Sequence, residues 1–147
     1  MKFYCDTSFL LKLYIREADS AIAIDFIQQI QPAYLPFNSF LELELYSAIE
    51  GKMFRKEITL IELESALKVI SDHKKNSFLR MEKLDWDTSF AQAKTLVHTV
   101  GTRRHGARTL DLIHIAIAKE SKCDRFMTFD HRQGRVAKAL GMDVQLI

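Results

Sequence analysis

Short apolar runs alternate along the chain with segments in which apolar residues recur every three or four positions. The short apolar runs are typical of buried strands, and the spacing of three or four positions indicates amphipathic helices. The pattern predicts strands at residues 3–5, 33–35, 79–84, 125–129 and 144–147. Because helical segments separate these strands, we expect crossover connections between parallel strands. The predicted fold is α/β, with a central, mostly parallel sheet and helices on both faces.

Side chains that can cap a helix N-terminus mark where the predicted helices begin. Thr59 followed by Glu62 fits a capping box. The helix over 110–120 is apolar on nearly every side, which is typical of a buried helix. Residues 102–106 are polar and basic and are expected to form a loop. The other expected caps are Asp6–Ser8, Asp19, Asn38, Asp87 and Asp130.

The chain has 147 residues, which predicts a single domain over 1–147. No run approaches the roughly 18 consecutive apolar residues of a transmembrane helix. An acidic residue at the sixth position argues against a signal peptide. Cys5 and Cys123 each lie in a short apolar run and are expected to be buried free thiols. These features predict a cytoplasmic protein that does not associate with membranes.

Acidic side chains follow the predicted strands. Asp6 and Asp130 come directly after two strands, Glu44 lies in the helix that follows another, and Asp111 lies in the first turn of the buried helix. In open α/β sheets the sites lie at the carboxyl ends of the strands, so these acids are expected in one crevice. Taken singly, an Asp at a helix start is most often a cap.

Several carboxylates in one crevice repel each other unless a cation or a proton joins them. Mg²⁺ and Mn²⁺ are hard cations that take oxygen ligands, and they can activate water for attack on a phosphodiester. The acids taken together therefore predict a Mg²⁺ or Mn²⁺ site. The histidines and cysteines show no zinc-ligand spacing. His114 is expected to be a hydrogen-bonded structural residue.

Four segments resemble the acidic motifs of PIN-domain nucleases, and together they span nearly the whole chain. They are Lys2–Tyr14, Asn38–Ala48, Arg108–Ala118 and Cys123–Asp130. The sequences of these segments are similar to those of small VapC-type toxins of toxin–antitoxin pairs. The resemblance implies a metal-dependent endoribonuclease that cleaves RNA, is inhibited by a cognate antitoxin and forms a homodimer. Apolar residues on the helices between 9 and 70 could serve the core, a dimer or an antitoxin groove.

The resemblance also assigns roles to residues. It implies that Asp6, Glu44, Asp111 and Asp130 are the catalytic, metal-binding acids. Glu42 stays an alternative to Glu44, because both lie in the same motif. The supporting residues are Thr7, Asn38, which stands where the family often has Ser or Thr, and Thr128, which could orient a carboxylate or a water.

The net charge of +2 is too small to indicate nucleic-acid binding by itself. Cations nevertheless flank two of the acids. Arg104 and Arg108 precede Asp111, and Arg132 follows Asp130. We expect these arginines to contact RNA phosphates, with a solvated loop and helix face as the alternative. Arg103, His105, His131 and Arg135 lie in the same two groups.

Three other functions fit part of the pattern. A non-catalytic α/β interaction module would use the acids only as helix caps. A phosphatase or receiver domain also places acids at strand ends, but the paired acids of those classes are missing here. An RNA-processing PIN nuclease without an antitoxin would share the whole site.

Overall fold

The structure is a computed structural model that describes residues 1–146. Within these residues helices and strands alternate in the predicted order. The strands are β1 (Phe3–Cys5), β2 (Leu35–Phe37), β3 (Leu79–Met81), β4 (Arg125–Thr128) and β5 (Asp143–Leu146). The helices are α1 (Thr7–Tyr14), α2 (Ser20–Ile30), α3 (Ser39–Phe54), α4 (Leu60–Lys75), α5 (Trp86–His98), α6 (Thr102–His105), α7 (Thr109–Glu120) and α8 (His131–Ala139).

The chain divides into two compact units. The terminal unit contains residues 1–6 and the chain from residue 83 onward, and so holds both ends of the sequence. The inserted unit contains residues 7–82, between these two parts. Each unit has its own parallel strands, which confirms the predicted α/β class and parallel pairing. The strands form two separate ladders, one in each unit.

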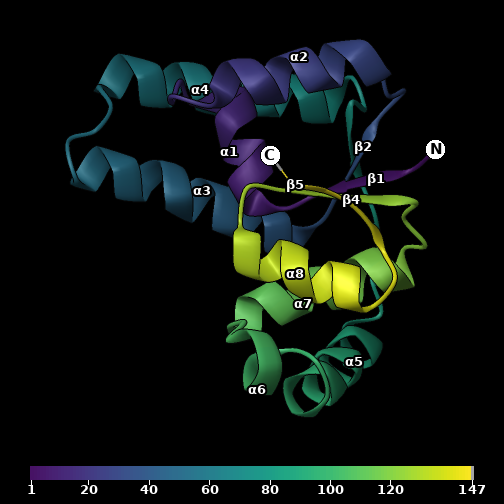
Figure 1. Ribbon diagram of the computed structural model, residues 1–147. Coiled ribbons are helices and arrows are strands. Elements are labelled where there is room, and N and C mark those ends of the chain that lie inside the picture. Colours follow the sequence, from purple (N-terminus) through teal and green to yellow (C-terminus); the bar gives the residue numbers. More distant parts are fainter. Residues whose placement is uncertain (147) are drawn as a thin grey trace. The chain divides into compact units, whose positions relative to one another are not determined.

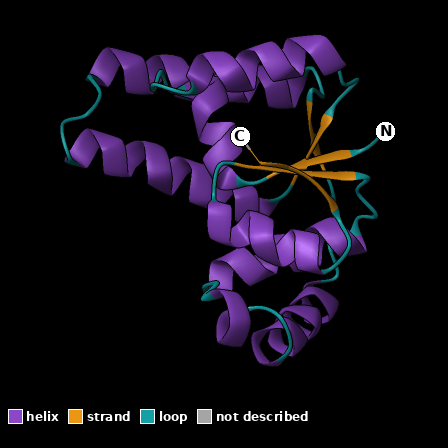
Figure 2. Cartoon of the chain, viewed as in Figure 1, coloured by secondary structure: helices purple, strands orange, loops and turns teal. Residues whose placement is uncertain are grey.

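The ladder of the terminal unit has the order β1-β4-β5, and every pair in it is parallel. Figure 2 shows these strands as neighbouring arrows. Tyr4 lies opposite Phe126, and Phe126 lies opposite Val144. Strands β1 and β4 are buried along nearly their whole length, as continuous apolar runs predict. The register places Asp6, just beyond β1, beside the carboxyl end of β4.

Helices α5, α6, α7 and α8 complete the terminal unit. Helix α7 is buried from Leu112 to Ala118, because its sequence is apolar on nearly all sides, and it packs against α5 and α8. Helix α8 also packs against β4 and β5. His114 is buried on α7, and its Nδ1 lies 2.9 Å from the Tyr4 hydroxyl. This contact confirms the structural role predicted for His114.

The inserted unit pairs β2 with β3 and packs α1 against α2, α3 and α4. Helices α3 and α4 form a hairpin of two long helices (Figure 1). Asn38 caps α3 by accepting a hydrogen bond from the Leu41 N–H at 2.9 Å. Thr59 and Glu62 form the predicted capping box at the start of α4. Local cap chemistry therefore fixes where both helices begin.

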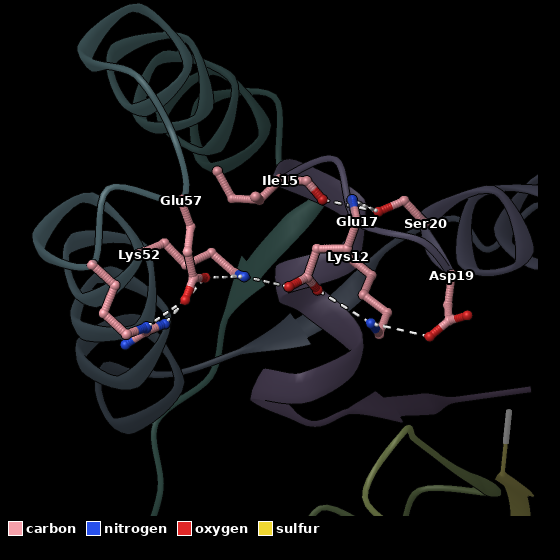
Figure 3. A network of polar contacts seen from close by, with 8 residues as sticks. Lys12, Ile15, Glu17, Asp19, Ser20, Lys52 and Glu57 are labelled. Atoms are coloured by element: carbon pink, nitrogen blue, oxygen red, sulfur yellow. Dashed lines mark hydrogen bonds and ion pairs between the residues drawn. The ribbon is translucent and has the colours of Figure 1, made fainter.

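An ionic network fastens α1 and the turn after it to α3 (Figure 3). Lys12 lies 3.1 Å from Glu17 and 3.5 Å from Asp19. Lys52 on α3 pairs with Glu17 and, at 3.0 Å, with Glu57. Hydrogen bonds to these lysines lower the pKa of Glu17, although partial burial opposes the shift. Hydrogen bonds from Arg55 and Lys52 lower the pKa of Glu57 to about 2.

The strand predicted at 33–35 lies at Leu35–Phe37, and the strand predicted at 79–84 ends at Met81. Three further local expectations were wrong. Asp85, rather than Asp87, caps α5, since its carboxylate accepts the Thr88 N–H at 3.2 Å. Residues 102–105 form the short helix α6 rather than a loop. Asp19 occupies the cap position of α2, but its carboxylate pairs with Lys12 and makes no capping hydrogen bond.

Both cysteines are free, as predicted, but only Cys5 is fully buried. Burial raises the pKa of the Cys5 thiol, and the neighbouring Asp6 adds to the shift. The thiol therefore stays protonated and is a poor nucleophile. Among residues 1–146, no helix combines the length and the apolar character needed to cross a bilayer.

The ionic network predicts a pH-dependent contribution to stability. A carboxylate whose pKa is lower in the folded state stabilises the fold above its unfolded pKa of 4.5, and this contribution is lost as the pH falls below that value. Glu17→Gln should therefore lower the free energy of unfolding at pH 7 by up to about 1 kcal/mol. The difference from wild type should shrink steadily below pH 4.5, as measured by urea unfolding. Glu50→Gln, an exposed change on α3, is the control, and an effect of Glu17→Gln that is constant with pH would contradict the account.

Candidate active site

Asp6 is held at the carboxyl end of β1. The residue is only 1% exposed, and its Oδ2 accepts a hydrogen bond from the Thr128 hydroxyl. Its backbone N–H donates to the Met127 carbonyl at 3.1 Å, which extends the pairing of β1 with β4. Parallel pairing thus brings together two residues that are 122 positions apart in the sequence.

Thr128 connects Asp6 to the acid that follows β4. While its hydroxyl donates to Asp6, the same oxygen accepts the Asp130 N–H at 2.8 Å. The Asp130 carboxylate caps α8, with Oδ1 accepting the N–H groups of Arg132 at 2.8 Å and Gln133 at 3.1 Å. The prediction that Asp130 caps a helix is therefore confirmed. The cap uses only Oδ1. Oδ2 of Asp130 has no hydrogen bond to any residue that the structure describes.

Asp111 is half-buried in the first turn of α7, directly before the buried stretch from Leu112 to Ala118. Its Oδ2 accepts the Arg108 N–H at 2.7 Å, and its Oδ1 accepts the Gln133 side-chain amide at 3.3 Å. Both donors are neutral, so they orient the carboxylate without cancelling its charge.

The sequence analysis missed Gln133. It lies on the buried stripe of α8 with Val136 and Ala137, at the spacing that places three residues on one helix face. A glutamine in an otherwise apolar stripe was the available signal, because a buried polar group requires a partner.

These contacts join the acids of the terminal unit into one chain of hydrogen bonds. We call Asp6, Thr128, Asp130, Gln133 and Asp111 the acid network. The hydrogen bonds that join its members come from hydroxyl and N–H groups. Carboxylate oxygens are the ligands that Mg²⁺ and Mn²⁺ prefer, so the donor set fits such an ion. Over residues 1–146, however, no three His, Cys, Asp or Glu side chains gather into a preformed metal cluster.

The three candidate arginines belong to the same unit as the acid network. Arg108 precedes α7, Arg104 lies on α6, and Arg132 lies in the first turn of α8, against which both α6 and α7 pack. Arg104 and Arg108 are exposed, and Arg132 is half-buried. None of these three guanidinium groups forms an ion pair with any residue that the structure describes. They are therefore available for an anionic ligand.

In the inserted unit the two candidate glutamates of α3 have different partners. Glu44 accepts a hydrogen bond from the Thr7 hydroxyl at 2.7 Å, and Thr7 directly follows Asp6 in the sequence. Glu42 instead forms an ion pair with Lys74 of α4. Glu42 is thus paired with a cation of α4, whereas Glu44 accepts a neutral donor from the start of α1.

The fold and these acids define a class of protein: an α/β domain with parallel strands and carboxylates after the strands. The chain belongs to the PIN domain family, which it matches over residues 3–139. Proteins with this domain are typically nucleases and typically depend on metal ions.

Among solved structures, the chain is similar to the toxin VapC20 of Mycobacterium tuberculosis, which cleaves the sarcin–ricin loop. The two share 15% sequence identity, the superposition has a TM-score of 0.67, and it covers 96% of each chain. At this identity the likeness shows the fold. No curated protein matches the sequence.

The hydroxyl of Thr128 should stabilise the terminal unit. Thr128→Val keeps the shape but removes a donor from the buried Asp6 and the acceptor of the Asp130 N–H. We expect the free energy of unfolding to fall by about 1–3 kcal/mol in urea titrations. Thr128→Ser keeps the hydroxyl, so its free energy of unfolding should fall less than that of Thr128→Val. If valine were as stable as threonine, the hydroxyl would not be needed to hold Asp6.

Proposed function

We propose that the protein is a metal-dependent endoribonuclease and the toxin of a toxin–antitoxin pair. The observation that supports this most strongly is the acid network, in which three carboxylates of one unit are oriented by neutral donors. An arrangement used only for helix capping would not require a buried Asp6 or a glutamine that reaches Asp111.

In this proposal Asp6, Glu44, Asp111 and Asp130 are the catalytic acids and hold Mg²⁺ or Mn²⁺. Glu44 is preferred to Glu42 because Lys74 already pairs with Glu42, while Glu44 binds the residue next to Asp6. A bound divalent ion would supply an activated water and stabilise negative charge on a phosphodiester. The two units together would form the single PIN domain, which agrees with a family match that spans both.

The remaining residues have supporting roles. Thr128 fixes the Asp6 carboxylate, Thr7 orients Glu44, and Asn38 sets the start of the helix that carries Glu44. Arg104, Arg108 and Arg132 would contact the phosphates of the RNA substrate.

A cognate antitoxin and a second copy of the chain are the proposed protein partners of this cytoplasmic toxin. The inserted unit has an apolar pocket of about 600 Å³ lined mainly by α1, α2 and α4. Large apolar side chains are also exposed on α2 and α4, including Ile22, Ile61 and Val69. Exposed apolar side chains and an apolar pocket are features that protein interfaces often use. The fold shared with VapC20 supports the same assignment.

The activity is tested by incubating the purified protein with a mixed RNA pool in Mg²⁺, in Mn²⁺ and in EDTA. We expect endonucleolytic cuts in both metals and none in EDTA. Asp6→Asn and Asp111→Asn should each lower the cleavage rate by at least about 100-fold, because each removes a negative charge that would hold the metal ion. Asp72→Asn, an exposed change on α4, should be as active as wild type. Cleavage that persists in EDTA or in the Asp6 and Asp111 variants would contradict the proposal.

The arginines are tested by RNA affinity in EDTA, where no cleavage is expected. Each phosphate contact with a single strand contributes about 0.7 to the slope of log affinity against log salt. Arg104→Ala and Arg108→Ala should each weaken binding and reduce that slope by about this amount, as measured by fluorescence anisotropy. Arg16→Ala, an exposed change in the inserted unit, is the control. Equal slopes for all variants would show that these arginines do not bind RNA.

A further inference from the structure

Within the acid network, Gln133 is the one residue that contacts both Asp111 and Asp130. Its backbone N–H donates to Asp130 Oδ1 at 3.1 Å, and its side-chain amide donates to Asp111 Oδ1 at 3.3 Å. It lies in the first turn of α8, whereas Asp111 lies in the first turn of α7. Gln133 therefore fixes one acid relative to the other.

The other end of the same side chain has no partner. Gln133 is only 4% exposed, and its Oε1 accepts no hydrogen bond from any residue that the structure describes. A buried acceptor without a donor destabilises a fold, and an apolar side chain of the same shape would avoid that cost. Stability alone does not explain a glutamine at this position.

The orphaned oxygen follows from the orientation of the amide. An ionised carboxylate only accepts hydrogen bonds, so the NH₂ group of Gln133 must face Asp111. If the amide were turned, Oε1 would face the Asp111 carboxylate. Two acceptor oxygens would then lie against each other, and Oε1 would still have no donor. The NH₂ group of Gln133 therefore provides a donor to Asp111, while Oε1 of the same side chain is left buried without a donor.

A neutral donor differs from a cation in its effect on a metal ligand. Lys74 pairs with Glu42 and cancels its charge. The Gln133 amide and the Arg108 N–H hold the two oxygens of Asp111 and leave its negative charge intact. Groups that orient ligands in this way commonly raise metal affinity by about 10–100-fold.

We propose that Gln133 is a positioning residue that holds Asp111 ready to bind a divalent cation. The inference rests on the proposed function, since it assumes that Asp111 is a metal ligand. It assigns Gln133 no contact with substrate. The glutamine acts by orienting the carboxylate, and it does so at a cost in folding stability.

Two measurements on the full chain test this role. Gln133→Met keeps the length of the side chain but removes both the donor and the orphaned oxygen. We expect its affinity for Mn²⁺, measured by titration calorimetry, to fall about 10-fold or more. We expect its urea midpoint without metal to equal or exceed that of wild type. Gln92→Met on α5 is the matched control and should bind Mn²⁺ as wild type does.

The possible results separate the two proposals. Weaker Mn²⁺ binding at unchanged or higher stability supports the positioning role, since a merely structural glutamine would show the opposite pattern. Wild-type Mn²⁺ affinity in Gln133→Met overturns this inference and leaves the proposed function standing. A wild-type protein that binds no Mn²⁺ overturns both. If Gln133→Met does not fold, Gln133→Leu is measured in the same way with the same criteria.

Discussion

The hydrogen bond from the Thr128 hydroxyl to the buried Asp6 carboxylate is the contact on which the candidate site depends. It exists because β1 and β4 pair in parallel, which brings their carboxyl ends to the same edge of the sheet. The same hydroxyl accepts the Asp130 N–H, so it also fixes the start of α8. Helix α8 in turn presents Gln133 to Asp111. One strand pairing therefore sets the position of three acids.

Repulsion between like charges is the constraint that the terminal unit has to meet. Lysine or arginine partners would relieve it but would compete with a metal ion for the same oxygens. The hydrogen bonds of the acid network come from a hydroxyl and N–H groups, which orient Asp6, Asp111 and Asp130 without adding positive charge. Arg104 and Arg132 lie on the neighbouring helices α6 and α8, and Arg108 directly precedes α7.

Features set by nearby residues could be predicted from the sequence. The strands, the caps at Asn38 and Asp130 and the Thr59–Glu62 capping box follow from spacing and side-chain chemistry within a few positions. Asp85 and Asp87 could not be distinguished, because both lie within reach of the first turn of α5.

Contacts between distant residues could not be predicted in this way. Spacing alone gave no reason to pair Glu42 with Lys74, 32 positions away, and left Glu42 and Glu44 as alternatives. The contact of Gln133 with Asp111 likewise depends on how α7 packs against α8. The resemblance to PIN-domain nucleases named the acids and Thr128, the donor to Asp6, but it offered nothing on Gln133, the donor to Asp111.

The most direct test of the metal site is an anomalous diffraction map from crystals grown with Mn²⁺. The account predicts a Mn²⁺ peak with carboxylate oxygens of Asp6 and Asp111 at about 2.1 Å, or bridged to it by water. Glu44, rather than Glu42, should be the glutamate nearest to it. A Mn²⁺ peak that lies only at other positions in the crystal, or no peak beside Asp6 at saturating Mn²⁺, would contradict the account.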